Sequence, residues 1–132
     1  MSSLDTNVLL RFAMKDEPQH FVRARALLGQ AGAVHMVADA VWVELAFALE
    51  YHYHLDRGAV ADVVTTLLGI PSLHTNRAVI EATCLVFVGH PKLSFADCYV
   101  ASFASQSGAA PLYTFDEKLA RQHADAVLVP FV

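Results

Sequence analysis

The stretch Ser3-Leu4-Asp5-Thr6-Asn7-Val8-Leu9-Leu10-Arg11-Phe12 places an acid at the junction of two kinds of local structure. Asp5 ends a short apolar run and stands directly before Thr6 and Asn7, which favour the first turn of a helix. The order is therefore strand, acid, helix. Ligands and catalytic groups collect at the carboxyl ends of the strands in an open α/β sheet, so this order predicts that Asp5 lies in a functional site.

Short apolar runs alternate with helical patterns along the rest of the chain. We expect further strands at residues 34–38, 70–74, 112–114 and 127–129, and helices at residues 6–13, 18–31, 40–53, 56–68, 76–88, 94–108 and 116–123. Alternation of this kind implies right-handed crossovers and parallel strands. We therefore predict one α/β domain over residues 1–132, a three-layer α/β/α sandwich around a mostly parallel sheet of about four to five strands.

Composition narrows the possible classes of protein. Of the 132 residues, 55% are hydrophobic, which fits a sheet covered on both faces or a large interface. No apolar run approaches the roughly 20 residues of a spanning helix, and the first residues lack the pattern of an export signal. Cys84 and Cys98 lie in apolar surroundings typical of buried free thiols, so we expect a cytoplasmic protein.

The net charge of -4 argues against broad affinity for nucleic acids, because such affinity depends on many Lys and Arg contacts to phosphate. A local basic patch remains open, since Arg11, Lys15, Arg23 and Arg25 cluster early in the chain.

Four acids have neighbours that are unusual for a solvated charge: Asp5, Glu44, Asp97 and Asp116 each follow or interrupt an apolar run. A buried charge without a partner costs several kcal/mol, and residues 39–55 contain no Lys or Arg. A divalent cation is the better candidate for compensation, because Mg²⁺ and Mn²⁺ prefer oxygen ligands. Such a cluster suits metal-assisted hydrolysis of a phosphodiester bond.

Each acid also has a purely structural interpretation to weigh. Asp97 lies three residues after Ser94, which is the spacing of a capping box, and Asp116 stands where an N-cap is expected. Glu44 shows no cap or partner in the sequence. The four acids together favour a metal site over four unrelated structural roles.

The motifs around these acids resemble those of the PIN-domain ribonucleases. They are Leu4-Asp5-Thr6-Asn7-Val8-Leu9, Glu44 in the helix after the second strand, Phe95-Ala96-Asp97 and Thr114-Phe115-Asp116. The resemblance covers essentially the whole chain, and the size is similar to that of the stand-alone VapC-type toxins of toxin–antitoxin pairs.

The resemblance implies an endoribonuclease that depends on Mg²⁺ or Mn²⁺, a cognate antitoxin whose tail occupies the site, and a homodimer. It assigns Asp5, Glu44, Asp97 and Asp116 as catalytic and metal-binding residues. Thr6 begins the helix after the first acid, and Asn7 and Thr114 match polar positions beside the acids. The RNA target, the antitoxin and the basic residues that bind RNA stay unassigned.

Two other functions remain open. One is a binding module that keeps the fold and its partners without catalysis. The other is a phosphatase of the haloacid-dehalogenase kind, whose pattern requires a second aspartate at the position that Asn7 holds.

Overall fold

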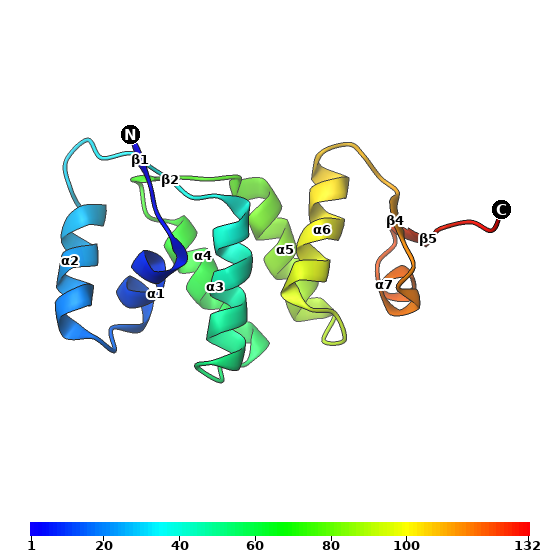
Figure 1. Ribbon diagram of the computed structural model, residues 1–132, viewed down its shortest axis with the longest axis horizontal. Helices are drawn as coiled ribbons and strands as arrows, with labels where there is room; N and C mark the ends of the chain where they lie inside the picture. Colours follow the sequence, from blue (N-terminus) through cyan, green and yellow to red (C-terminus); the bar gives the residue numbers. More distant parts are fainter. The chain divides into compact units, whose positions relative to one another are not determined.

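The computed structural model describes all of residues 1–132, with five short strands and seven helices. The chain forms two compact units, Met1–Arg77 and Ala78–Val132, and each is described here by itself. Figure 1 shows the order of the elements along the chain. The strands and helices lie within three residues of the expected ranges, which confirms the α/β class.

The first unit contains β1 (Ser2–Ser3), α1 (Thr6–Met14), α2 (Pro18–Leu28), β2 (His35–Met36), α3 (Asp39–Tyr51), α4 (Arg57–Leu68) and β3 (Leu73–His74). Its strands are parallel in the order β1-β2-β3, with Ser2 opposite His35 and His35 opposite Leu73. Asp5 follows the first strand of this sheet, at the carboxyl edge where parallel strands present their ligands.

The second unit contains α5, which begins at the last residue of the first unit (Arg77–Gly89), then α6 (Phe95–Gln106), β4 (Leu112–Thr114), α7 (Glu117–Gln122) and β5 (Ala126–Leu128). The strands β4 and β5 are parallel, and α7 packs against both of them. Every strand pairing is therefore parallel, as expected, and hydrogen bonds group the strands into one sheet of three in the first unit and one of two in the second.

The helix α3 supplies much of the core of the first unit. Trp42, Leu45 and Leu49 are fully buried, and the Trp42 indole donates a 2.7 Å hydrogen bond to the Thr75 hydroxyl. That hydroxyl in turn donates to the carbonyl of Val37 at 3.0 Å, so the indole N–H is satisfied where α3 begins. The side of α3 away from this core is exposed at Glu44, Phe47 and Tyr51.

Three expected bounds also need correction. The helix α3 begins at Asp39, one residue before the expected start, and Ala38 is its N-cap. The strand β3 begins at Leu73 rather than at residue 70, because Pro71 lies in a turn before the strand. The helix α2 ends before Gly29, and the left-handed residue Gly32 then turns the chain toward β2.

Cys84 and Cys98 are both buried and form no disulfide, as the sequence predicts. None of the seven helices is long and apolar enough to cross a membrane.

Candidate functional site

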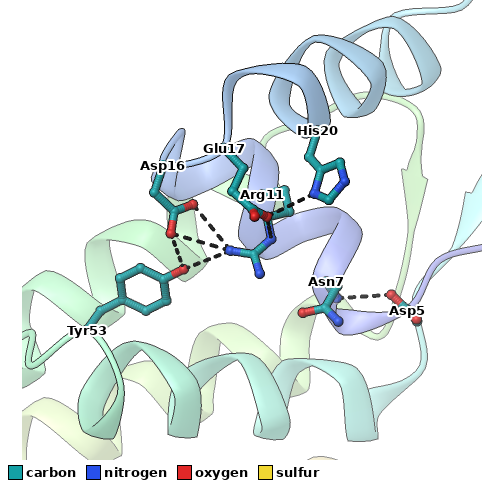
Figure 2. Close-up of polar contacts among 7 residues, drawn as sticks. All are labelled: Asp5, Asn7, Arg11, Asp16, Glu17, His20 and Tyr53. Carbon is teal, nitrogen blue, oxygen red and sulfur yellow. Dashed lines mark hydrogen bonds and ion pairs between the residues drawn. The ribbon is translucent and has the colours of Figure 1, made fainter.

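The first candidate acid, Asp5, is the N-cap of α1. Its Oδ1 atom accepts a 3.0 Å hydrogen bond from the backbone N–H of Asn7, which fixes the carboxylate at the first turn of the helix (Figure 2). Its second oxygen, Oδ2, makes no hydrogen bond or ion pair. Asp5 therefore uses one carboxylate oxygen in the cap, and the other oxygen has no hydrogen bond.

Glu44 comes to the same turn from α3. Its Oε2 atom accepts a 2.5 Å hydrogen bond from the hydroxyl of Thr6, the residue that follows Asp5. Sequence reasoning found no partner for Glu44, since no signal in the sequence joins positions 38 residues apart. The structure thus brings Asp5 and Glu44 to one turn of α1, with Oε1 of Glu44 unengaged.

A cleft of about 510 Å³ opens beside this turn. Thr6, Asn7, Glu44 and His52 form its polar wall, and Phe47 and Ala48 form part of its apolar wall. Thr6 and Asn7, expected as supporting residues, therefore line a cleft that the candidate acid Glu44 also lines.

The other two candidate acids belong to the second unit. Asp116 is the N-cap of α7, and its Oδ1 accepts from the backbone N–H groups of Lys118 and Leu119 at 2.9 and 3.1 Å. The Thr114 hydroxyl accepts from the backbone N–H of Asp116 at 2.9 Å. As in Asp5, one oxygen caps the helix and the other, Oδ2, makes no hydrogen bond.

Asp97 lies in the first turn of α6, whose N-cap is Ser94. The Ser94 hydroxyl accepts a 3.1 Å hydrogen bond from the backbone N–H of Asp97, so this half of the expected capping box uses the backbone and leaves the Asp97 carboxylate unused.

The expectation that the four acids are buried is wrong. Asp5, Glu44 and Asp116 are exposed, and Asp97 is half-buried. Carboxylates at the beginnings of helices lie beside backbone N–H groups that face solvent, and an apolar run before such a position does not cover them. Burial therefore gives no reason to require a cation, and the case for one depends on the kind and position of the ligands.

The donors at the first turn of α1 fit a hard cation. Asp5 and Glu44 offer carboxylate oxygens, and Thr6 and Asn7 add a hydroxyl and an amide oxygen. Mg²⁺ is usually held by one or two carboxylates together with water and substrate phosphate oxygens. The two carboxylates at this turn are therefore ligands of the type and number that Mg²⁺ requires from a protein. Residues 1–132 contain no group of three or more His, Cys, Asp or Glu side chains placed to hold a metal ion.

A polar network that the sequence did not reveal lies on the α2 side of α1. Arg11 donates from Nη1 to Asp16 and to the Tyr53 hydroxyl, and it pairs through Nε with Glu17 at 2.8 Å (Figure 2). The hydrogen bond from Tyr53 is the main cause that lowers the pKa of Asp16, and the same bond raises the pKa of Tyr53. The spacing of these residues carries no helical signal that would have predicted the network.

Comparison with proteins of established function gives no match. Comparison with protein families matches the PIN domain over residues 3–124, which includes all four candidate acids and spans parts of both units. PIN domains are typically nucleases, and they generally use divalent metal ions. Because the match covers nearly the whole chain, this protein belongs to the PIN domain family and has its nuclease-type α/β fold.

Proposed function

We propose that the protein is an endoribonuclease that depends on Mg²⁺ or Mn²⁺ and acts as the toxin of a toxin–antitoxin pair in the cytoplasm. The observation that carries the proposal is the convergence of Asp5 and Glu44 on the first turn of α1 in a PIN domain. Each of these acids gives one oxygen to the fold and leaves one for a ligand.

In this proposal Asp5, Glu44, Asp97 and Asp116 are the catalytic and metal-binding residues. Asp97 and Asp116 are included because their motifs match the family pattern. When bound, a divalent cation activates water and stabilises the charge that develops on the phosphate oxygens.

The residues of the chain itself orient these ligands. Asp5 and Asp116 are held by backbone N–H groups, and Glu44 is held by the Thr6 hydroxyl. Hydrogen bonds of this kind fix the direction of a carboxylate before the ligand arrives, which lowers the cost of ordering it. Capping and ligation are therefore compatible roles, because they use different oxygens of one carboxylate.

The proposed partners are RNA, a cognate antitoxin and a second copy of the chain. Exposed apolar side chains support a protein partner in general: Phe47 and Tyr51 of α3 are each 55% exposed, with ring centroids 4.7 Å apart, and Leu85 of α5 is 79% exposed. Side chains of this size are commonly covered by another protein surface.

The direct test is cleavage of cellular RNA by the purified protein, freed of antitoxin, with Mg²⁺ or Mn²⁺. We expect cleavage that chelator stops, growth arrest on expression, and neither effect with Asp5→Asn, since asparagine preserves the N-cap but removes the charge. Mapping of RNA ends after brief expression then identifies the target. A folded wild-type protein without cleavage and without growth arrest would instead indicate a binding module.

A further inference from the structure

A second cleft, of about 460 Å³, lies between α1 and α2. Its polar lining consists of Asn7, Arg11, His20 and Arg23, and Val8 and Leu27 contribute to its apolar floor. No carboxylate lines it. We call it the cationic cleft, because two arginines, Arg11 and Arg23, line it in a chain whose net charge is -4.

The turn between α1 and α2 orients Arg11 in this cleft. Lys15 adopts a left-handed conformation with φ of 56° at the end of α1, and Asp16 and Glu17 follow it. These two carboxylates engage Nη1 and Nε of Arg11 (Figure 2). The remaining nitrogen, Nη2, takes part in no hydrogen bond or ion pair of the structure.

Glu17 also positions His20. Its Oε2 atom, which pairs with Nε of Arg11, lies 2.9 Å from Nδ1 of His20 (Figure 2). The other ring nitrogen of His20, Nε2, makes no hydrogen bond. Arg23, one helical turn after His20, is exposed and forms no ion pair. The cleft therefore offers N–H donors from Arg11 and Arg23, and the guanidinium of Arg11 is held in place by Asp16 and Glu17.

The cationic cleft adjoins the candidate site. Asn7 lines both this cleft and the cleft of Glu44, and its backbone N–H is bonded to Asp5. A strand of RNA that lies across the first turn of α1 would therefore contact Asp5 and Glu44 on one side and the arginines of the cationic cleft on the other. Arginine in particular matches phosphate, because its planar guanidinium donates two parallel hydrogen bonds.

We propose that the cationic cleft binds a backbone phosphate of single-stranded RNA next to the phosphate that is cleaved, with Arg23 and Arg11 as its main donors. The inference rests on the proposed ribonuclease function and names the part of the protein that holds the substrate. It accounts for RNA binding by an acidic protein, since the contact is local and needs few positive charges.

The test compares two arginines of one helix. Arg23 lines the cleft, whereas Arg25 lies two residues on, faces another direction and stacks on Phe21 at 5.4 Å. Binding of a fluorescent single-stranded 12-nucleotide RNA of mixed sequence is measured in EDTA over a series of salt concentrations. We expect Arg23→Gln to raise Kd about fivefold, and Arg23→Glu to raise it further, while Arg25→Gln and Arg25→Glu change it much less.

The salt dependence gives a second readout. Loss of one phosphate contact to a single strand should reduce the slope of log K against log salt by about 0.7 for Arg23→Gln, with no such change for Arg25→Gln. Equal losses for the two arginines would overturn the proposal, because they would indicate only a change in net charge. The proposal would also be overturned if wild type bound a polyglutamate peptide as tightly as it binds the RNA, because that result would favour a protein partner.

Binding without metal separates this inference from the proposed function. If wild type cleaves RNA while Arg23→Gln and Arg25→Gln bind RNA alike, the proposed role of the cationic cleft is wrong and the proposed ribonuclease function is retained. If wild type fails to cleave while only the Arg23 variants lose binding, the cleft stands as an RNA site. Circular dichroism melting checks that each variant is folded. The charge-reversal variants Arg23→Glu and Arg25→Glu provide an independent comparison of RNA affinity.

Discussion

The hydroxyl of Thr6 donates a 2.5 Å hydrogen bond to the carboxylate of Glu44. This bond joins the first residue of α1 to the middle of α3, and so connects two of the four candidate acids through the residue next to Asp5. The contact orients Glu44 without occupying its second oxygen. Several tests of the proposed site depend on this arrangement, in which one oxygen of a carboxylate is hydrogen-bonded within the protein and the other is not.

Thr6→Val removes this hydroxyl and preserves the shape of the side chain. We expect a loss of roughly 10- to 100-fold in Mn²⁺ affinity or in cleavage, which is typical when a partner of a metal ligand is removed. Isothermal titration with Mn²⁺ and a single-turnover cleavage assay measure the two effects. Thr65→Val, at an exposed position of α4, serves as the matched control and should leave both values unchanged.

Asp97→Asn should abolish cleavage yet melt no lower than wild type in chelator. The cap of α6 uses the Ser94 hydroxyl and the backbone N–H of residue 97, and both persist in this variant. Ser94→Ala is the complementary change: it should cost about 1 kcal/mol of stability while the Asp97 carboxylate remains. Thermal melts and cleavage rates are compared for the two variants. A large loss of stability in Asp97→Asn would assign Asp97 to capping instead.

Asp116 allows capping and ligation to be separated at one position. Asparagine still accepts from the N–H groups of Lys118 and Leu119, so Asp116→Asn should retain stability and lose cleavage. Asp116→Ala should lose both, with a decrease of about 1 kcal/mol in the free energy of unfolding. Equal stability of the two variants in urea denaturation would show that the cap contributes little.

Addition of Mn²⁺ should raise the melting temperature of wild type, because a ligand that binds only the folded state stabilises it. At a concentration 100 times Kd the gain is about 2.7 kcal/mol. Asp5→Asn should show a much smaller gain, while its melt in chelator matches that of wild type because asparagine still accepts the capping hydrogen bond from Asn7. Differential scanning fluorimetry with and without Mn²⁺ gives both comparisons, and an equal metal response would exclude Asp5 as a ligand.

Tyr53→Phe should destabilise the protein in a pH-dependent way. The Tyr53 hydroxyl lowers the pKa of Asp16 below its ordinary 3.8, so this stabilisation is present above pH 3.8 and disappears as pH falls through the lowered value. The pKa of Tyr53 is raised above 10.0, so its contribution is present below pH 10.0 and disappears as pH rises through the raised value. The difference in stability between wild type and Tyr53→Phe should therefore be largest between these limits.

Urea denaturation over this pH range measures the effect. Tyr113→Phe is the control, because the Tyr113 side chain is 61% exposed and its hydroxyl has no hydrogen bond. A pH-independent difference between wild type and Tyr53→Phe would contradict the linkage to Asp16.

The sequence predicted features whose causes are local. Ser94 and Asp116 were placed at the beginnings of helices as caps, and each accepts a hydrogen bond from a backbone N–H three residues away. The strand Leu112–Thr114 was predicted with its observed bounds. The PIN motifs were likewise readable, because each is a short run of adjacent residues. That the four acids share one metal site remains a prediction.

Only the tertiary structure decided the features that depend on residues far apart in the chain. The partner of Glu44 is 38 residues away, and the Tyr53 hydroxyl reaches Arg11 across 42 residues. Exposure of the four acids also differed from the expectation, because apolar neighbours in sequence need not be neighbours in space. A cap is determined by hydrogen bonds within one turn, whereas a cleft is determined by how helices pack, and the sequence records that packing only indirectly.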